Sequence, residues 1–173
     1  MNKIKIFLDS LKLKTFTEQD AEDYCMLNSI NPDKIIDLWL SHNKLTDISG
    51  IKLFKNLKYL YINDNKIKDI SALKNLTELE MLDIKSNNIK DISVVQSLIQ
   101  LKIFHNGYNE IKDISVLKYL INIEILDIKE LKLESDQIKY INSLKDLKQL
   151  YCQKGFKDMS VLNQLNKNIK MII

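Results

Sequence analysis

The sequence predicts an α/β solenoid, a fold in which one short structural unit is stacked on copies of itself. The main observation is an asparagine that recurs with a step of 22 residues, at Asn43, Asn65, Asn87 and Asn109. Around each Asn the same frame returns, Leu-x-x-Leu-x-Ile-x-x-Asn-x-Ile-x-Asp-Ile-Ser. A fixed period of this length is typical of solenoids, because a single unit cannot bury its apolar side without neighbours.

Residues 1–34 precede the repeats and do not share their frame. The stretch Thr17-Glu18-Gln19-Asp20 has the spacing of a capping box and predicts a helix at about 18–28. Asn31-Pro32-Asp33 is the expected exit turn. We expect this helix to be an N-terminal cap that covers the open edge of the first strand and the end of the core.

The repeats occupy residues 35–173, and the last of them is truncated. They begin at Ile35, Leu57, Leu79, Leu101, Ile123 and Leu147, with the truncated copy beginning at Ile169. The fifth repeat is 24 residues long and has Leu131 at the Asn position. Ser135 is its expected N-cap, for a helix through 138–144. Because the sixth repeat has Gly155 at the Asn position, we expect local distortion of the solenoid at both of these repeats.

Each part of the frame has a structural interpretation. Leu-x-x-Leu-x-Ile alternates as a strand does, with Leu and Ile inward and the x positions outward. Asn carries donors and acceptors, so a stacked column of Asn can satisfy the backbone where the chain leaves the strand. In Asp-Ile-Ser, Asp or Ser is expected to accept backbone N–H groups at the start of a helical turn. These polar residues are therefore predicted to be structural.

Asn106 interrupts an apolar column of the frame. The other repeats have Leu40, Ile62, Ile84, Ile128 and Cys152 at this position. A buried Asn needs hydrogen-bond partners. We expect the strand to bulge beside Gly107; the alternative is an irregular solenoid at this point.

Composition bounds the function. The chain has 173 residues, a net charge of +3 and 26 basic residues, all of them Lys. The absence of Arg argues against nucleic-acid recognition, since Arg is preferred for bidentate contacts with bases and phosphates. The two Cys form no disulfide framework, and no signal peptide or membrane span is evident. The expected location is the cytoplasm, without a membrane partner.

The Asn column followed by Ile or Leu and then Asp-Ile-Ser closely resembles the internalin-type leucine-rich repeats. The same subclass includes the regulatory leucine-rich-repeat subunits of protein phosphatase 1. The resemblance covers about residues 35–173. It implies a horseshoe with a parallel β-sheet on the concave face, short helical or 3-10 turns on the convex side, and protein recognition through the concave sheet. Unlike internalins, the chain is expected to have no export signal, no trailing immunoglobulin-like domain and no wall-anchoring tail.

The outward strand positions form two predicted ladders on the concave face. The third positions are Asp37, Tyr59, Met81, Ile103, Ile125 and Gln149, and the fifth positions are Trp39, Tyr61, Asp83, His105, Asp127 and Tyr151. Aromatic and apolar residues gathered on one face indicate an interaction surface, and Trp and Tyr are enriched at hot spots. The three Asp and the absence of Lys from both ladders predict a protein partner with a basic surface.

Catalytic and cofactor motifs are missing from the sequence. The two His, His42 and His105, lie about three strands apart, and no phosphate loop, HExxH or CxxC occurs. Asp83 and Asp127 are an acid–base pair only in principle, because an open sheet excludes no water. The sequence therefore predicts no enzyme, no cofactor and no metal site.

Two functions fit a small repeat protein with such a face. The first is an intracellular inhibitor, such as an immunity protein that neutralises a basic, nuclease-type toxin. The alternative is a regulatory scaffold or host-directed effector that binds a cellular enzyme such as a phosphatase. The terminal segment 169–173 is also expected to pair with a partner or a second copy, because bare strand edges invite pairing.

Overall fold

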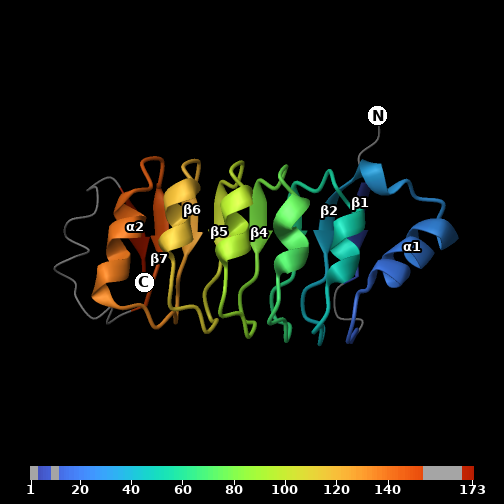
Figure 1. Cartoon of the computed structure of the whole chain (residues 1–173), viewed down its shortest axis with the longest axis horizontal. Helices are drawn as coiled ribbons and strands as arrows, with labels where there is room; N and C mark the ends of the chain where they lie inside the picture. The colour runs from blue at the N-terminus through green and yellow to red at the C-terminus, as the bar shows by residue number, and fades with distance from the viewer. Residues whose placement is uncertain (1–3, 9–11, 154–168) are drawn as a thin grey trace.

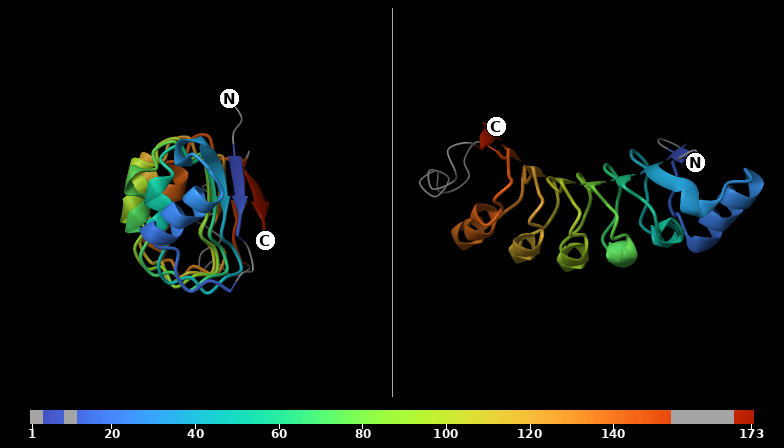
Figure 2. Two further views of the ribbon diagram at one scale, coloured as in Figure 1. Left: turned by 90° about the vertical axis from the view of Figure 1, so that its right-hand side faces the viewer. Right: turned by 90° about the horizontal axis from the view of Figure 1, so that it is seen from above.

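The computed structural model describes residues 4–8, 12–153 and 169–173. These residues form one open sheet of eight parallel strands that follow one another in chain order (Figure 1). Figure 2 shows the strands along the inner side of an arc and the helical turns fanned along its outer side. The leucine-rich-repeat horseshoe, with a concave parallel sheet and convex turns, is confirmed.

The regular elements are short. The strands are β1 (Ile4–Phe7), β2 (Ile35–Trp39), β3 (Tyr59–Tyr61), β4 (Met81–Asp83), β5 (Ile103–His105), β6 (Ile125–Asp127), β7 (Gln149–Tyr151) and β8 (Lys170–Ile172). The 3-10 helices are η1 (Pro32–Lys34), η2 (Ser49–Leu53), η3 (Ser71–Asn75), η4 (Ser93–Ser97), η5 (Ser115–Tyr119) and η6 (Ser135–Gln137). The α-helices are α1 (Glu18–Leu27) and α2 (Ile138–Asn142).

The core is a set of apolar columns that run along the stack. One column is formed by the middle residues of the strands, and Leu60, Leu82 and Phe104 in it have no exposed surface. Burial of a side chain of this size stabilises the fold by about 1.5–3 kcal/mol. Each residue contacts its equivalents in the repeats on either side, so the core is continuous although no single repeat has one.

The Asn column has the predicted role. Asn65 donates from Nδ2 to the carbonyls of Leu40 and Ile62, at 3.0 Å each, and its Oδ1 accepts from the Leu45 N–H at 3.0 Å. Each Asn thus bonds to its own repeat and to the preceding one. Asn87 and Asn109 repeat this pattern.

The Asp-Ile-Ser turns also form as predicted. Asp69 Oδ1 accepts from the Ser71 N–H at 2.7 Å, which satisfies a donor at the start of η3. The same bond, at the same length, recurs at the other three Asp-Ile-Ser turns, from Asp47, Asp91 and Asp113.

The N-terminal segment differs from the expectation in one respect. Thr17 and Asp20 form the capping box of α1, with the Thr17 N–H donating to Asp20 Oδ2 at 2.7 Å. The open edge of β2, however, is covered by β1 and not by α1. The helix instead packs on η2, where a Cβ on Gly50 would come within 2.3 Å of the Thr17 carbonyl oxygen.

The segment before α1 takes the place of a repeat without sharing its sequence. Asn43 Nδ2 donates to the Leu8 carbonyl at 2.9 Å, and its Oδ1 accepts from the Leu13 N–H at 3.1 Å. Backbone groups need no particular side chain to make these bonds. This is why the frame does not reveal that the stack continues upstream of residue 35.

The predicted bulge at Asn106 is wrong. Strands β5 and β6 pair without a register shift, and the Asn106 N–H donates to the Asp127 carbonyl at 3.0 Å. The side chain is fully buried in the apolar column, and neither its Oδ1 nor its Nδ2 has a hydrogen-bond partner. The strands therefore keep their regular pairing even though this leaves the buried Asn106 amide without a hydrogen-bond partner.

The fifth repeat has a regular strand and an irregular convex side. Ser135 lies inside η6 and caps neither η6 nor α2 with its side chain, so the predicted N-cap is wrong. Strands β6 and β7 keep their register in spite of the two extra residues. The helical turn absorbs the insertion, and the expected distortion does not reach the sheet at Leu131. Gly155 lies outside the described residues.

The C-terminal strand is one residue out of the predicted frame. Met171 pairs with the inward residue Leu150, and Lys170 and Ile172 pair with the outward residues Gln149 and Tyr151. A repeat that begins at Ile169 would place Ile172 inward instead. Strand β8 forms the last strand of the described sheet.

Candidate functional site

The two predicted ladders exist as aligned rows of residues on adjacent strands. Tyr59 pairs with Asp37 and Met81, and Tyr61 pairs with Trp39 and Asp83. The register continues unchanged to Gln149 and Tyr151 in β7. All the predicted partner-binding residues therefore lie on the concave face of the sheet.

An aromatic cluster occupies the N-terminal end of this face. Trp39 and Tyr61 stack with their ring centroids 3.9 Å apart and their planes 25° apart. Trp39 Nε1 donates to Asp37 Oδ1 at 2.7 Å, which fixes the indole ring. Burial raises the pKa of Tyr61, and the charges of Asp37 and Asp83 add to this shift. The cluster is therefore rigid, with both rings partly exposed.

A second, polar cluster lies toward the C-terminal end of the face. His105 Nδ1 lies 3.6 Å from Asp83 Oδ2, and its ring meets the edge of Tyr151 with centroids 6.2 Å apart. Lys129 Nζ lies 5.7 Å from the centroid of the Tyr151 ring. His105 thus connects a carboxylate from the neighbouring repeat to an aromatic ring two strands away.

The carboxylates of the face are buried. Asp37, Asp83 and Asp127 are only 4%, 7% and 5% exposed, and Met81 is 7% exposed. Short side chains at the fifth position turn back onto their own backbone. Asp83 Oδ1 accepts from the Lys85 N–H at 3.0 Å, and Asp127 Oδ1 accepts from the Lys129 N–H at 2.9 Å. These acids serve the turn first, so they are less available for direct pairing than the strand pattern suggests.

Gly107 makes room for one of these carboxylates. A Cβ at this position would lie 2.9 Å from Asp127 Oδ1 and 2.8 Å from the Lys129 carbonyl oxygen. A side chain at this position would therefore require the Asp127 carboxylate and the Lys129 backbone to shift.

A row of ion pairs borders the face at the second strand position. Glu80 pairs with Lys58 on one side and, at 3.0 Å, with Lys102 on the other. Glu124 pairs with Lys148 at 2.6 Å. Hydrogen bonds from Lys58 and then Lys102 lower the pKa of Glu80. The sequence signal for this row is the alternation of Lys and Glu at the second repeat position, at Lys58, Glu80, Lys102, Glu124 and Lys148.

Chemistry on this face is limited. Among the described residues there is no group of three or more His, Cys, Asp or Glu side chains that could hold a metal ion. His42 Nδ1 lies 3.3 Å from Asp64 Oδ2. This pair is far in the chain from the pair of His105 and Asp83 and lies on a different turn. The arrangement of the two clusters is suited to contact with another molecule.

Comparison with known proteins agrees with this geometry. Residues 34–75 and 55–97 match the family model for leucine-rich repeats in two copies. The chain is a leucine-rich-repeat protein. No curated protein sequence matches it.

Three solved structures have the same fold as this leucine-rich-repeat protein. Internalin C2 of Listeria monocytogenes is 23% identical with a TM-score of 0.80, over 97% of this chain and 69% of its own. An internalin F structure from the same bacterium is 27% identical with a TM-score of 0.69, over 95% of this chain and 57% of its own. A leucine-rich-repeat protein of Leptospira interrogans is 24% identical with a TM-score of 0.74, over 96% of this chain and 41% of its own.

The chain spans 69%, 57% and 41% of the lengths of these three solved chains. The similarity to the internalins and to the Leptospira protein shows the fold of this chain. In the part of the chain that the structure describes, no helix is long and apolar enough to cross a membrane.

Proposed function

We propose that this protein is a non-catalytic binding module that holds a protein partner on its concave face. The observation that carries the proposal is the Trp39–Tyr61 stack, which is held by the Trp39–Asp37 hydrogen bond, is partly exposed and lies beside Tyr59 of the same strand as Tyr61. Preorganised aromatic rings contribute binding energy at a low cost in conformational entropy. Residues 1–34 serve as the cap in this proposal, and residues 35–173 as the binding domain.

The partner in this proposal has a basic surface and is inhibited when bound. Asp37, Asp83 and Asp127 lie under the aromatic and aliphatic side chains of the face. Their negative charges attract a cationic partner through the field of the face, and the exposed rings accept cation–π contacts. An immunity protein for a nuclease-type toxin has this requirement, because the active site of such a toxin is basic.

The proposed location is the cytoplasm. Two buried free thiols, Cys25 and Cys152, support this placement, since disulfides are rare in reducing compartments. Burial raises the pKa of both thiols, which reduces their reactivity.

Affinity capture tests the proposal. The immobilised protein is exposed to a lysate of its source cell, and the retained proteins are identified by mass spectrometry. We expect one basic protein that is lost with Trp39→Ala/Tyr61→Ala and kept with Tyr119→Ala/Ile121→Ala, a matched pair of exposed residues outside the sheet. The captured protein must then lose its enzymatic activity at a one-to-one ratio with nanomolar affinity.

Other outcomes redirect the function. Several partners that all depend on Trp39 and Tyr61 would support a regulatory scaffold or effector, for example one that binds a phosphatase. Capture that is unchanged by Trp39→Ala/Tyr61→Ala would contradict binding through the concave face.

The edge of β8 is a second proposed contact. In the described sheet, β8 pairs only with β7, and Ile173 is 56% exposed. We expect pairing with a second copy or a partner, since an open strand edge offers unpaired backbone groups. A dimer that Met171→Pro converts to a monomer in light scattering supports this contact, and a monomeric parent protein contradicts it.

A further inference from the structure

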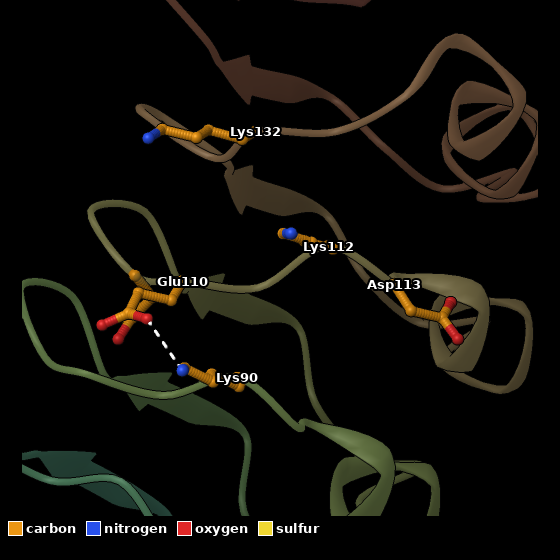
Figure 3. Close-up of a pocket in the computed structure, with 6 residues that line it drawn as sticks. Lys90, Glu110, Lys112, Asp113 and Lys132 are labelled. Atoms are coloured by element: carbon orange, nitrogen blue, oxygen red, sulfur yellow. Dashed lines mark ion pairs between the residues drawn. The ribbon is translucent and has the colours of Figure 1, made fainter.

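A hollow of about 480 Å³ lies where the fourth and fifth repeats meet, away from the concave ladders. It is lined by Lys90, Asn109, Glu110, Lys112, Asp113 and Lys132. Figure 3 shows that these side chains come from three successive repeats, on the loops that follow the strands. The three Lys are exposed, so the hollow is open to solvent.

The lining carries two cations that no carboxylate neutralises. Lys90 Nζ pairs with Glu110 at 3.2 Å, and this bond lowers the pKa of Glu110. Asp113 Oδ1 accepts a hydrogen bond from the Ser115 N–H at the start of η5. Figure 3 shows Asp113 across the view from Glu110. Among the described residues, Lys112 and Lys132 form no ion pair.

The backbone beneath the hollow has lost two hydrogen bonds of the repeat. In regular repeats the Ile67 and Ile89 N–H groups donate to the next Asn of the column, at 2.9 and 3.1 Å. The equivalent Ile111 N–H faces the position of Leu131, which has no acceptor. The structure records no hydrogen bond for this N–H in the described part of the chain.

The second lost bond belongs to Lys132. Its equivalents Lys66, Asn88 and Glu110 each donate from the backbone to the preceding repeat at 2.9 Å. For the Lys132 N–H, no such bond is recorded within the described residues. Among the described residues, the fourth and fifth repeats therefore lack two hydrogen bonds at this edge, where Lys112 and Lys132 line the hollow.

We propose that this hollow binds a phosphate-type oxyanion. Lys112 and Lys132 supply the charge, and the Lys132 N–H, for which no hydrogen bond is recorded within the described residues, supplies a directed donor. Backbone N–H groups beside Lys are a common way to bind phosphate. A phosphoryl group of charge about −2 interacts with both cations, whereas a carboxylate carries half that charge.

An NMR titration of the isotopically labelled chain tests the proposal. Inorganic phosphate and glycerol phosphate are added separately at constant ionic strength, and the amide shifts of Ile111, Lys112 and Lys132 are followed. Saturable shifts at these amides are expected. Tighter binding of glycerol phosphate identifies a phosphoryl group on an organic molecule, and equal or tighter binding of inorganic phosphate identifies the free ion.

Matched variants distinguish a specific phosphate site from nonspecific attraction of phosphate to exposed Lys. Lys112→Gln/Lys132→Gln should weaken binding about tenfold, the effect expected of losing charge-assisted hydrogen bonds. Lys66→Gln/Lys68→Gln removes two exposed charges from the second repeat, where the Asn column is complete, and should change nothing. Similar losses in the two variants, or shifts that do not saturate, overturn the proposal.

Leu131→Asn tests the role of the lost Ile111 hydrogen bond while all the charges remain. It restores the missing acceptor for the Ile111 N–H and should reduce phosphate binding about tenfold. Unchanged binding in a folded variant overturns this role. If the variant does not fold, the exposed lysine variants still decide whether the site exists.

Discussion

The first three repeats and the junction between the fourth and fifth repeats have the same sheet but different support. In the regular half, each Asn of the column joins two repeats, as Asn65 and Asn87 do. At the junction, Leu131 ends the column, and Asn106 brings an unpartnered amide into the core. The strands nevertheless keep their register through β7. Strand pairing and apolar burial therefore maintain the solenoid even where its polar column fails.

The largest expected effect is that of Asn65→Ala in the regular half. It removes the bonds to Leu40, Leu45 and Ile62 and leaves buried backbone groups unsatisfied. We expect a loss of about 3 kcal/mol in the free energy of unfolding, measured by urea denaturation. Asn63→Ala, at a partly exposed neighbour, should cost less than about 1 kcal/mol. Equal effects would mean that the column is not the main support of this half.

Asn106→Ile is expected to stabilise the junction. The side chain is fully buried without hydrogen bonds, and the neighbouring repeats have Ile84 and Ile128 at this position. We expect a gain of about 1–2 kcal/mol in unfolding free energy. The reverse change, Ile84→Asn, should cost at least as much. A destabilised Asn106→Ile variant would show that the amide has a partner in solution.

Hydrogen exchange compares the two regions directly. The Ile67 and Ile89 amides donate to Asn side chains, and the Ile111 amide does not. We expect Ile111 to exchange about tenfold faster than either equivalent, because local opening there breaks fewer bonds. Equal protection of the three amides would show that the junction is as tightly closed as the regular repeats.

The smallest effect concerns the ion pairs beside the face. Glu80 pairs with Lys on both sides, whereas Glu124 pairs with Lys148. Because the pKa of Glu80 is lowered in the folded state, its contribution is present at neutral pH and is lost as the pH falls below about 4.5. Glu80→Gln should cost at most about 1 kcal/mol at pH 7, more than Glu124→Gln, and progressively less as the pH falls below about 4.5. A difference that does not shrink as the pH falls would contradict the electrostatic origin.

Several features were predicted from residues that act locally. The Asn column, the Asp-Ile-Ser turns and the Thr17 capping box each involve side chains that bond within a few residues or at a fixed period. The two concave ladders follow from strand alternation. Their register is regular because each step of 22 residues places equivalent side chains on adjacent strands.

Other features depend on contacts between repeats that no local pattern contains. Strand β1 joins the sheet through backbone groups, so its sequence does not need to match the frame. The burial of Asp83 and Asp127 results from their turn toward the Lys85 and Lys129 N–H groups. The hollow at Lys112 lies where Leu131 offers no side-chain acceptor to the preceding repeat.

The amino-acid sequence by itself determined the repeat, its strand faces and its polar column, because periodic burial and side-chain hydrogen bonding are encoded at every step. Only the tertiary structure decided what remains exposed on the concave face, how the stack begins at β1, and where hydrogen bonds between two repeats are lost. These properties depend on how one repeat covers the next. The sequence alone does not distinguish an Asp that the fold buries from an Asp that it leaves exposed.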